Sequence, residues 1–405
     1  MKLELHWQIL IAMALGLLFA TTFGEVGWVA WVADTFMRLL RMVIVPLIFT
    51  SIVHGVAGIG DGKALGRLGV KTLLWYTLTS LMAILVGLTL ANAIRPGAGL
   101  EMPEGVQALQ PENLQMPDSL AGIVTRLIPS NPVEAAATFD ILGLIFFSIC
   151  LGAAVGLTRG EPGDLLRRFF EAAFGVMMKL TRGVIRLLPI GVFALLARAV
   201  GQMGLDVFEQ VGQYMLTIAL GLSVHWLVGL PLLFFLLTRK NPLHHYRAMG
   251  SALAMAFSTS SSGATLPMTI HCVRENVGAS DKVTSFVLPM GATINMDGTA
   301  LFECVGALFI AQALGFELSL ATQGVIVLTA LLASIGAAAI PSAGLVMIFI
   351  VLQAIGLNTP EAYALAGLML GVDRPLDMFR TMVNVTSDSV GAAVIAHSEG
   401  EPLNY

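Results

Sequence analysis

Long apolar segments separated by polar loops run through the first half of the chain. They cover residues 5–23, 36–60, 70–94, 120–158, 167–201 and 207–238, and the fourth is long and interrupted by loops. A helix needs ~20 predominantly apolar residues to cross a bilayer core of ~30 Å. A membrane β-barrel would instead show alternating segments of about ten residues. The pattern therefore predicts an all-α polytopic membrane protein.

Two later apolar segments, residues 250–270 and 320–356, are interrupted at their centres by small residues. The interruptions read STSSSGATLP and IGAAAIPSAG. Non-helical backbone at membrane depth is tolerated only where protein or a water-filled cavity covers it. A flexible kink would explain one break alone. Two such breaks, each followed by a span with polar motifs, predict re-entrant hairpins at a transporter substrate site.

Composition supports the membrane class. Hydrophobic residues make up 56% of the chain and charged residues 12%, whereas soluble domains carry about 25% charged residues. The net charge of −4 gives no indication of a nucleic-acid partner. Cys150, Cys272 and Cys304 fit neither a disulfide framework nor a metal site. The first segment lacks a strong basic region and a clear cleavage site, so we interpret it as a retained span in a bacterial inner membrane.

Basic residues in the loops predict the orientation, because short cytoplasmic loops are rich in Lys and Arg. The loop 95–126 is instead acidic. We therefore expect a cytoplasmic N-terminus, a first hairpin that opens from the cytoplasm and a second that opens from outside. The basic loop residues are Lys63, Arg67, Lys71, Arg159, Arg167, Arg168, Arg239, Lys240 and Arg247.

A stretch of the last apolar segment, DRPLDMFRTMVNVTSD at 373–388, is unusually polar. On a helix that advances about 100° per residue, its polar side chains share one stripe about 100° wide. Ionisable groups at membrane depth usually face a protein interior or a wet cavity. A structural Asp–Arg pair would explain one contact, but a stripe several turns long favours a binding site. The stripe comprises Asp373, Asp377, Arg380, Thr381, Asn384 and Asp388.

A second polar island, GATINMDGTALFE at 291–303, lies in the preceding span. Asn295 and Asp297 offer side-chain oxygens, and Gly291 and Gly298 weaken the helix so that carbonyls can turn inward. Hard cations prefer several oxygen ligands of this kind. Further hydroxyls stand within about one helical turn in WYTLTS, although Ser and Thr often bond back to their own helix. These hydroxyls belong to Tyr76, Thr79 and Ser80.

These motifs, with MVIVPLIFTSIV, RPGAG and ASIGAAAIPSAG, resemble the dicarboxylate/amino acid:cation symporters nearly end to end. That family includes the archaeal aspartate transporter and the mammalian excitatory amino-acid transporters. The resemblance implies eight transmembrane helices, two re-entrant hairpins and a homotrimer that works by an elevator mechanism. The scaffold would comprise residues 1–69 and 95–201, and the transport domain residues 70–94 and 202–405.

The resemblance also implies a pocket for L-aspartate or L-glutamate. Arg380 would hold the side-chain carboxylate in bidentate geometry, Asp377 the α-amino group and Asn384 the α-carboxylate. Relatives commonly carry a further arginine where this chain has Ser260 or Met378, and Arg374 is nearby but not equivalent. The rest of the pocket would be Ser260, Ser261, Ser262, Met296, Thr299, Ile340, Gly344 and Thr381.

Sodium ions are the expected co-transported species, and no prosthetic group is expected. The resemblance implies one sodium site at Gly291, Asn295, Asn384 and Asp388, a second at Tyr76, Thr79, Ser80, Asn295 and Asp297, and a third at carbonyls of Thr293, Ser334, Ile335 and Ala337. Glu303 is a candidate proton carrier. An isolated carboxyl in an apolar span favours its protonated form, and the matching position in mammalian glutamate transporters is a glutamate associated with proton co-transport. A satisfied structural carboxyl or an ion-pair partner is the alternative.

Other functions fit the sequence less well. A C4-dicarboxylate carrier needs no carboxylate for an ammonium group, so Asp377 favours an amino acid, and a neutral amino-acid carrier would lack Arg380. A purely proton-coupled symporter and an ion channel remain alternatives. An intramembrane aspartyl protease needs two carboxylates that share a proton. The GIGD that ends at Asp61 is instead interpreted as a turn beside a basic loop.

Overall fold

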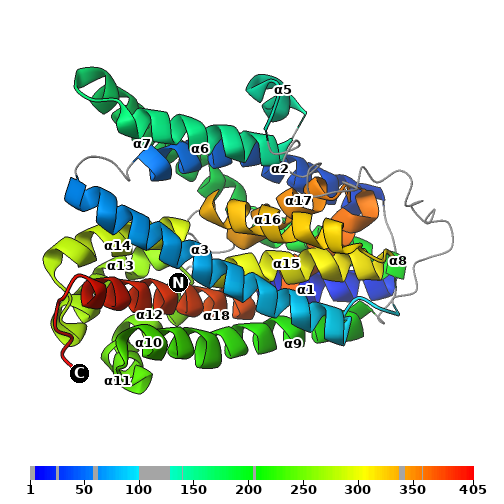
Figure 1. Cartoon of the computed structure of the whole chain (residues 1–405). Helices are drawn as coiled ribbons and strands as arrows, with labels where there is room; N and C mark the ends of the chain where they lie inside the picture. Colours follow the sequence, from blue (N-terminus) through cyan, green and yellow to red (C-terminus); the bar gives the residue numbers. More distant parts are fainter. Residues whose placement is uncertain are drawn as a thin grey trace.

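The computed structural model describes residues 5–23, 27–57, 63–99, 128–138, 140–203, 207–336, 343–357 and 359–405. Every regular element in these ranges is helical, which confirms the predicted all-α class (Figure 1). Long, apolar helical segments suited to crossing a bilayer cover Arg67–Ile94, Val211–Thr238 and Asp281–Ala313. Shorter apolar helices cover Ile11–Phe23, Val45–Ala57, Gly143–Leu157, Leu188–Arg198 and Leu320–Ile335.

The helices of the first half follow the apolar segments with shifted ends. α2 begins well before residue 36, and Asp34 lies in the added part; α3 begins before residue 70, and its added part carries Lys63 and Arg67. An apolar pattern excludes these charged residues. The expected span 167–201 is wrong as a single helix, since a turn at residues 186–187 precedes Pro189, which disfavours helical backbone before it. The bounds are α1 Leu5–Phe23, α2 Gly27–Ala57, α3 Lys63–Ile94, α5 Pro132–Ala137, α6 Ile141–Leu157, α7 Glu161–Ile185 and α8 Leu188–Met203.

The span predicted at 207–238 is one continuous helical rod with a wider turn inside it. It comprises α9 (Val207–Val224), the π-helical turn η2 (His225–Gly229) and α10 (Leu230–Thr238). The Leu230 N–H donates to the His225 carbonyl, five residues back. Pro231 follows and has no N–H to give to a normal helical bond. Such π turns occur frequently at functional sites.

The first interrupted segment forms two helices that pack on each other, and two helices also flank the break in the second. α12 (Gly250–Thr259) ends at Ser260, whose φ of 50° is left-handed, and Ser261 caps α13 (Ser262–His271). α16 (Leu320–Gly336) packs against α17 (Ala343–Ala354), and the expected tip at residues 337–342 lies outside the described residues. The remaining elements are α11 Pro242–Ala248, η3 Cys272–Val277, α14 Asp281–Ile294, α15 Asp297–Ala313 and α18 Pro360–Ser398.

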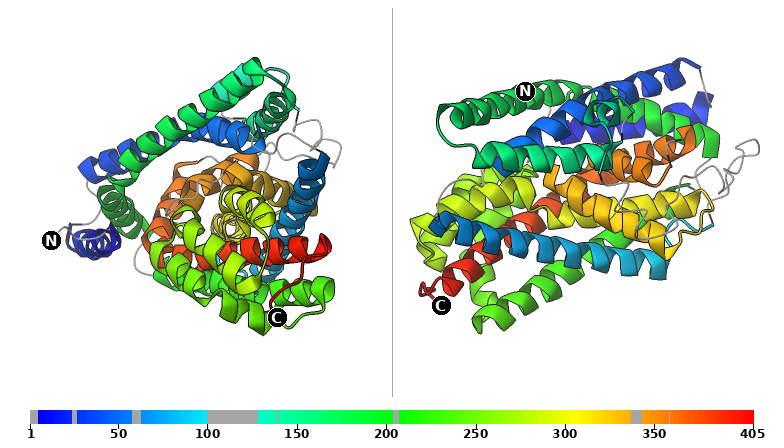
Figure 2. Two further views of the ribbon diagram at one scale, coloured as in Figure 1. Left: turned by 90° about the vertical axis from the view of Figure 1, so that its left-hand side faces the viewer. Right: turned by 45° about the horizontal axis from the view of Figure 1, so that its top comes forward.

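The helices pack in two groups. α1 packs on α8, and α2 packs on α6, α7 and α8. The second group comprises α3, α9 and α12–α18, in which α3 packs on α9, α14, α15, α16 and α18. Figure 2 shows the two groups on different sides of the molecule. The groups meet where α8 lies against α18. α15 lies at the centre of the larger group, and every residue in it except Gln312 is buried.

Candidate functional site

A break between α14 and α15 places the polar groups of the NMD sequence inside the protein. α14 ends at Ile294, and Asn295 and Met296 leave helical geometry before α15 begins at Asp297. The last carbonyls of a helix have no partner within that helix, and the Gly291 carbonyl accepts from the Asn295 N–H at 2.9 Å; the inward-facing carbonyls stay a prediction. Gly298 permits the contact with α18, because a Cβ there would lie 2.9 Å from the Arg380 carbonyl oxygen.

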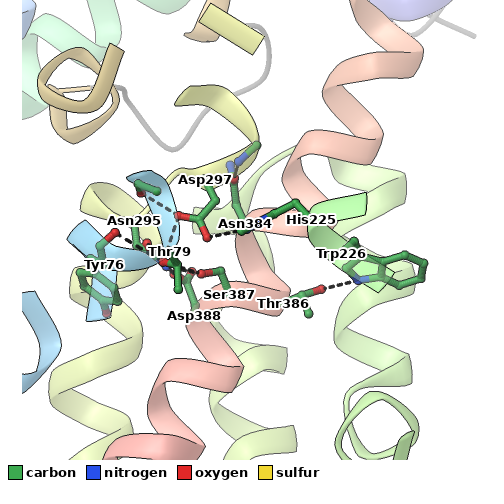
Figure 3. A network of polar contacts seen from close by, with 12 residues as sticks. Tyr76, Thr79, His225, Trp226, Asn295, Asp297, Asn384, Thr386, Ser387 and Asp388 are labelled. Atoms are coloured by element: carbon green, nitrogen blue, oxygen red, sulfur yellow. Dashed lines mark hydrogen bonds and ion pairs between the residues drawn. The ribbon is translucent and has the colours of Figure 1, made fainter. Parts of the chain in front are cut away.

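Asp297 is the centre of a buried polar cluster. Its Oδ1 accepts hydrogen bonds from Ser80 Oγ at 2.6 Å and Thr79 Oγ1 at 3.2 Å. Its Oδ2 lies 3.0 Å from His225 Nε2, and neither side chain is exposed. Figure 3 shows His225 approaching Asp297 from the side opposite Tyr76 and Thr79. Three helices thus converge on one carboxylate.

Asn295 links this carboxylate to α18. Its Nδ2 donates to Asp388 Oδ1 and to Ser387 Oγ, both at 2.9 Å, and Ser387 Oγ donates to Thr79 Oγ1 at 3.3 Å. The glycine at 291 is required here, because a Cβ would stand 2.5 Å from Asp388 Oδ1. The residues expected in the first two sodium sites therefore lie side by side.

The chemistry of this cluster suits a hard cation. Carboxylate, amide and hydroxyl oxygens from α3, the α14–α15 break and α18 meet in a buried volume, and such oxygens are the ligands of hard cations. In the ranges that the structure describes, no group of three or more His, Cys, Asp and Glu side chains could hold a metal ion. We call the side chains of Tyr76, Thr79, Ser80, Asn295, Asp297, Ser387 and Asp388 the oxygen cluster.

The ligands expected for a third sodium site are placed only in part. Thr293 lies in the last turn of α14 and its hydroxyl bonds back to the Met290 carbonyl at 3.0 Å. Ser334 and Ile335 lie in the last turn of α16, where carbonyls lack partners within the helix. Ala337 lies outside the described residues, so the site remains a prediction.

A second buried centre is built around Arg380. Its Nη2 bonds Asp377 Oδ1 at 2.7 Å and Asp373 Oδ1 at 2.8 Å, and its side chain is 1% exposed. The Phe302 ring lies 3.9 Å below the guanidinium carbon, a favourable cation–π geometry. Asp377 also meets Arg374, at 3.7 Å. The predicted stripe on α18 is thus real, and the helix continues through Pro375.

Arg380 keeps unused donors. Its Nε and Nη1 have no hydrogen-bond partner among the described residues. A Cβ at Gly344 would lie 2.9 Å from Nη1 and 3.2 Å from Thr299 Cγ2, so the start of α17 faces the guanidinium closely. Unsatisfied buried donors are costly unless something binds them. These N–H groups could donate hydrogen bonds to an anionic ligand.

Most of the other expected pocket residues are buried in the protein. Asn384 lies between the two centres, with Oδ1 accepting from the Gly298 N–H at 2.8 Å and Nδ2 donating to Thr299 Oγ1 at 3.4 Å. Met296 and Thr381 are buried. The hairpin serines lie at the α12–α13 turn: Ser260 and Ser262 are buried, and Ser261 Oγ caps α13 by accepting from the Ala264 N–H at 3.2 Å. Ile340 lies outside the described residues.

Glu303 lies on α15 directly after Phe302. It is fully buried, and neither of its carboxyl oxygens has a hydrogen-bond partner in the part of the chain that the structure describes. Glu303 is therefore not held by hydrogen bonds in this part of the chain, although it lies within electrostatic range of Arg380. Its role as a proton carrier stays a prediction.

Sequence reasoning missed His225 and Ser387. Between residues 211 and 238, His225 is the only charged or titratable residue other than Tyr214, and this isolation is the signal that the sequence offers. The signal does not identify a site, because the sequence does not show which face of the helix the histidine occupies. Ser387 precedes Asp388 in the polar stretch, but on a helix the neighbour of a ligand usually points elsewhere.

Buried ionic and oxygen-rich centres inside an all-helical membrane protein define a transporter for charged solutes. The family model described as the sodium:dicarboxylate symporter family matches residues 5–398, and the chain belongs to this family. The members of this family are symporters, which confirms the expectation of a transporter rather than an enzyme.

Curated relatives agree with this assignment. The chain is 35% identical to mouse excitatory amino acid transporter 3, over 90% of this chain and 78% of the relative. It is 36% identical to human excitatory amino acid transporter 2, over 93% and 74% respectively. A putative sodium-dependent excitatory amino acid transporter of Caenorhabditis elegans, glt-4, is 37% identical over 92% and 83%. The resemblance inferred from the motifs is therefore confirmed.

Proposed function

We propose that this protein is a secondary active symporter that takes up L-aspartate or L-glutamate together with sodium ions and a proton. The observation that carries the proposal is the buried Arg380 guanidinium, with free donors on Nε and Nη1, beside a buried oxygen cluster. The relatives named as sodium-dependent or excitatory amino acid transporters support the same substrate class.

The substrate would bind between Arg380, Thr299 and the start of α17. A substrate side-chain carboxylate would accept the free guanidinium donors, and charge-assisted bonds of this kind are about twice as strong as neutral ones. Asp377 would meet the α-amino group. Its carboxylate is already shared between Arg380 and Arg374, so the ammonium group would join an existing charge network. Asn384 would bind the α-carboxylate.

Sodium would bind at the oxygen cluster. Asp297 and Asp388 supply formal negative charge, and Asn295, Thr79, Ser80, Tyr76 and the Gly291 carbonyl supply neutral oxygens. Asn384 contacts Gly298 and Thr299, so it connects the cation cluster to the substrate pocket. Filling the cluster would fix the α14–α15 break and thereby the pocket beside it, which couples sodium binding to substrate binding.

We propose that transport proceeds by an elevator mechanism in a homotrimer of eight-span subunits with two re-entrant hairpins. Residues 1–69 and 95–201 would form the scaffold, and residues 70–94 and 202–405 the moving transport domain. The packing of α3 on α9, α14, α15, α16 and α18, and of α1 and α2 on α8, supports this division. The boundary near residue 70 falls inside α3, which starts at Lys63.

The protein would lie in the bacterial inner membrane with a cytoplasmic N-terminus. The start of α3, α11 and the C-terminus lie at the same end of the molecule (Figure 1). Arg67 and Lys71 belong to that end of α3, Arg239 precedes α11, and Arg247 lies in its last turn. This end would face the cytoplasm, following the excess of basic residues in cytoplasmic loops.

Calorimetry on the purified protein tests the proposed coupling. L-aspartate should bind tightly with sodium and weakly without it. Asp388→Asn should raise the sodium concentration that gives half-maximal binding, because it removes a formal charge from a hard-cation site. Tight binding to the wild type in sodium-free buffer would contradict the proposal and favour a purely proton-coupled carrier.

A further inference from the structure

His225 contacts the oxygen cluster from a helix on which no cation ligand was predicted. Its Nε2 lies 3.0 Å from Asp297 Oδ2, and both side chains are fully buried. Asp297 Oδ1, the other oxygen, faces Ser80, Thr79 and the inside of the cluster. One carboxylate oxygen is thus held by histidine and the other is directed at the proposed cation.

The histidine ring itself is held in one orientation. It starts the π turn η2, and the widened turn brings Gly229 beside the ring: a Cβ at Gly229 would stand 3.3 Å from Nδ1 and 3.0 Å from Met82 Cε. Nδ1 has no hydrogen-bond partner among the described residues, whereas Nε2 has one. The ring therefore has a single polar contact, and that contact is Asp297.

We propose that His225 is a positioning residue for sodium binding: its Nε2–H fixes the Asp297 carboxylate so that Oδ1 points into the oxygen cluster. Hydrogen bonds from outer groups orient metal-ligating carboxylates, and losing such a bond typically lowers metal affinity about 10- to 100-fold. His225 does not itself contact the ion. This inference rests on the proposed sodium site at Asp297.

Three substitutions separate the effect of the hydrogen bond from the effect of the bulk of the ring. Glutamine places an amide N–H near the position of the histidine Nε2, whereas asparagine places it near Nδ1 and cannot reach Asp297. We expect His225→Asn to raise the sodium concentration for half-maximal L-aspartate binding by about 10- to 100-fold. His225→Gln should stay within about threefold of the wild type. His225→Met, which has similar bulk and no donor, should behave like His225→Asn.

The measurement is calorimetric titration of L-aspartate at graded sodium concentrations, with thermal unfolding of each variant as a check on folding. A structural role alone would lower the unfolding temperature without shifting the sodium dependence. Unchanged sodium dependence in His225→Asn and His225→Met would overturn the inference. So would failure of both His225→Asn and His225→Met to fold in saturating sodium, because His225 would then support the fold.

A double-mutant cycle shows whether the effect passes through Asp297. In an Asp297→Asn background, His225→Asn should produce little further shift, since the carboxylate that it positions is gone. Additive shifts would contradict the inference. If Asp297→Asn alone leaves sodium dependence unchanged, the proposed sodium site itself is wrong, and that outcome is distinct from a failure at His225 alone.

Discussion

At the scale of single residues, Arg380 has the most demanding environment in the described structure. A fully buried guanidinium needs counter-charges, and Asp373 and Asp377 supply them through one nitrogen. Breaking a buried ion pair by removing one partner typically costs 3–5 kcal/mol. The same residue is therefore expected to affect both binding and stability, and the two effects need separate measurements.

Arg380→Cys should abolish binding of L-aspartate and L-glutamate. A lost hydrogen bond to a charged group costs about 1.5–3 kcal/mol, and the remaining carboxylates would repel an acidic substrate. We expect a small neutral amino acid such as serine to bind better than aspartate. Calorimetry measures this, with Arg374→Gln as the matched control, since Arg374 is partly exposed and lies 3.7 Å from Asp377. Near wild-type aspartate affinity in Arg380→Cys would refute the assignment.

Asp377→Asn should distinguish an amino-acid carrier from a dicarboxylate carrier. The carboxylate would pair with a substrate ammonium group, so its loss should weaken L-aspartate binding by tenfold or more, in line with about 1.5–3 kcal/mol for a charged hydrogen bond. Succinate, which lacks the amine, should be affected far less. Competition assays with the two compounds measure the ratio. Equal losses would show that Asp377 serves the fold or a cation instead.

Helical periodicity allowed the α18 site residues to be placed from sequence, because a rigid period fixes which side chains share a face. Asp373, Asp377 and Arg380 meet as that period requires. His225 was missed because its partner is far away in the chain, at Asp297, and the contact depends on how α9, η2 and α15 pack. Periodicity within one helix carries no information about such contacts.

At the scale of elements, the positions of small residues and prolines mark the ends of helices more closely than the lengths of the apolar segments do. The break between α12 and α13 falls at Ser260–Ser261, inside the serine-rich sequence that interrupts the apolar segment. The length of the apolar run at 167–201 suggested one span, but Pro189 divides it into α7 and α8. An apolar run shows that a segment is buried in protein or lipid, whereas backbone chemistry decides where it breaks.

Two salt bridges connect the C-terminal end of α18 to the start of α3. Glu399 bonds Arg67 Nη2 and Lys71 Nζ, both at 2.5 Å, and these two cations lower the pKa of Glu399 from its ordinary 4.5 to about 2. The bond joins elements more than 300 residues apart in the chain. It therefore contributes to holding α3 within the larger helix group.

Glu399→Gln should lower the thermal unfolding temperature at neutral pH. Because the folded-state pKa lies below the unfolded one, the stabilisation is fully present above about pH 4.5 and is lost as pH falls from there towards about 2. The difference between wild type and variant should thus be constant near pH 5–7 and shrink in acid. Glu317→Gln, at an exposed pair with Arg95, is the control and should have little effect. A difference that grows in acid would contradict this account.

At the scale of the whole molecule, the proposed proton route depends on Glu303. Its carboxyl is buried in α15 and has no hydrogen-bond partner among the described residues. The proposed trimer and domain movement cannot be predicted from the pattern of apolar and polar positions in one chain. Lipid-facing and subunit-facing surfaces are both apolar, so periodicity cannot distinguish them.

Glu303→Gln should preserve exchange of substrate across the membrane but remove the pH dependence of net uptake. Glutamine has nearly the same shape and cannot carry a proton. Wild-type uptake should acidify the interior of proteoliposomes, as reported by a trapped pH dye, and uptake by the variant should not. If the interior stays at constant pH for both proteins, Glu303 has a structural role only.

The central claim is that sodium moving inward drives the uptake of an acidic amino acid. Its most direct test is accumulation of radiolabelled L-aspartate by wild-type proteoliposomes, with a sodium gradient and a pH gradient imposed separately. The account predicts concentrative uptake when a sodium gradient is imposed at equal pH, and further uptake when an inward proton gradient is added. Concentrative uptake driven by the pH gradient in sodium-free buffer, with none driven by sodium alone, would contradict it.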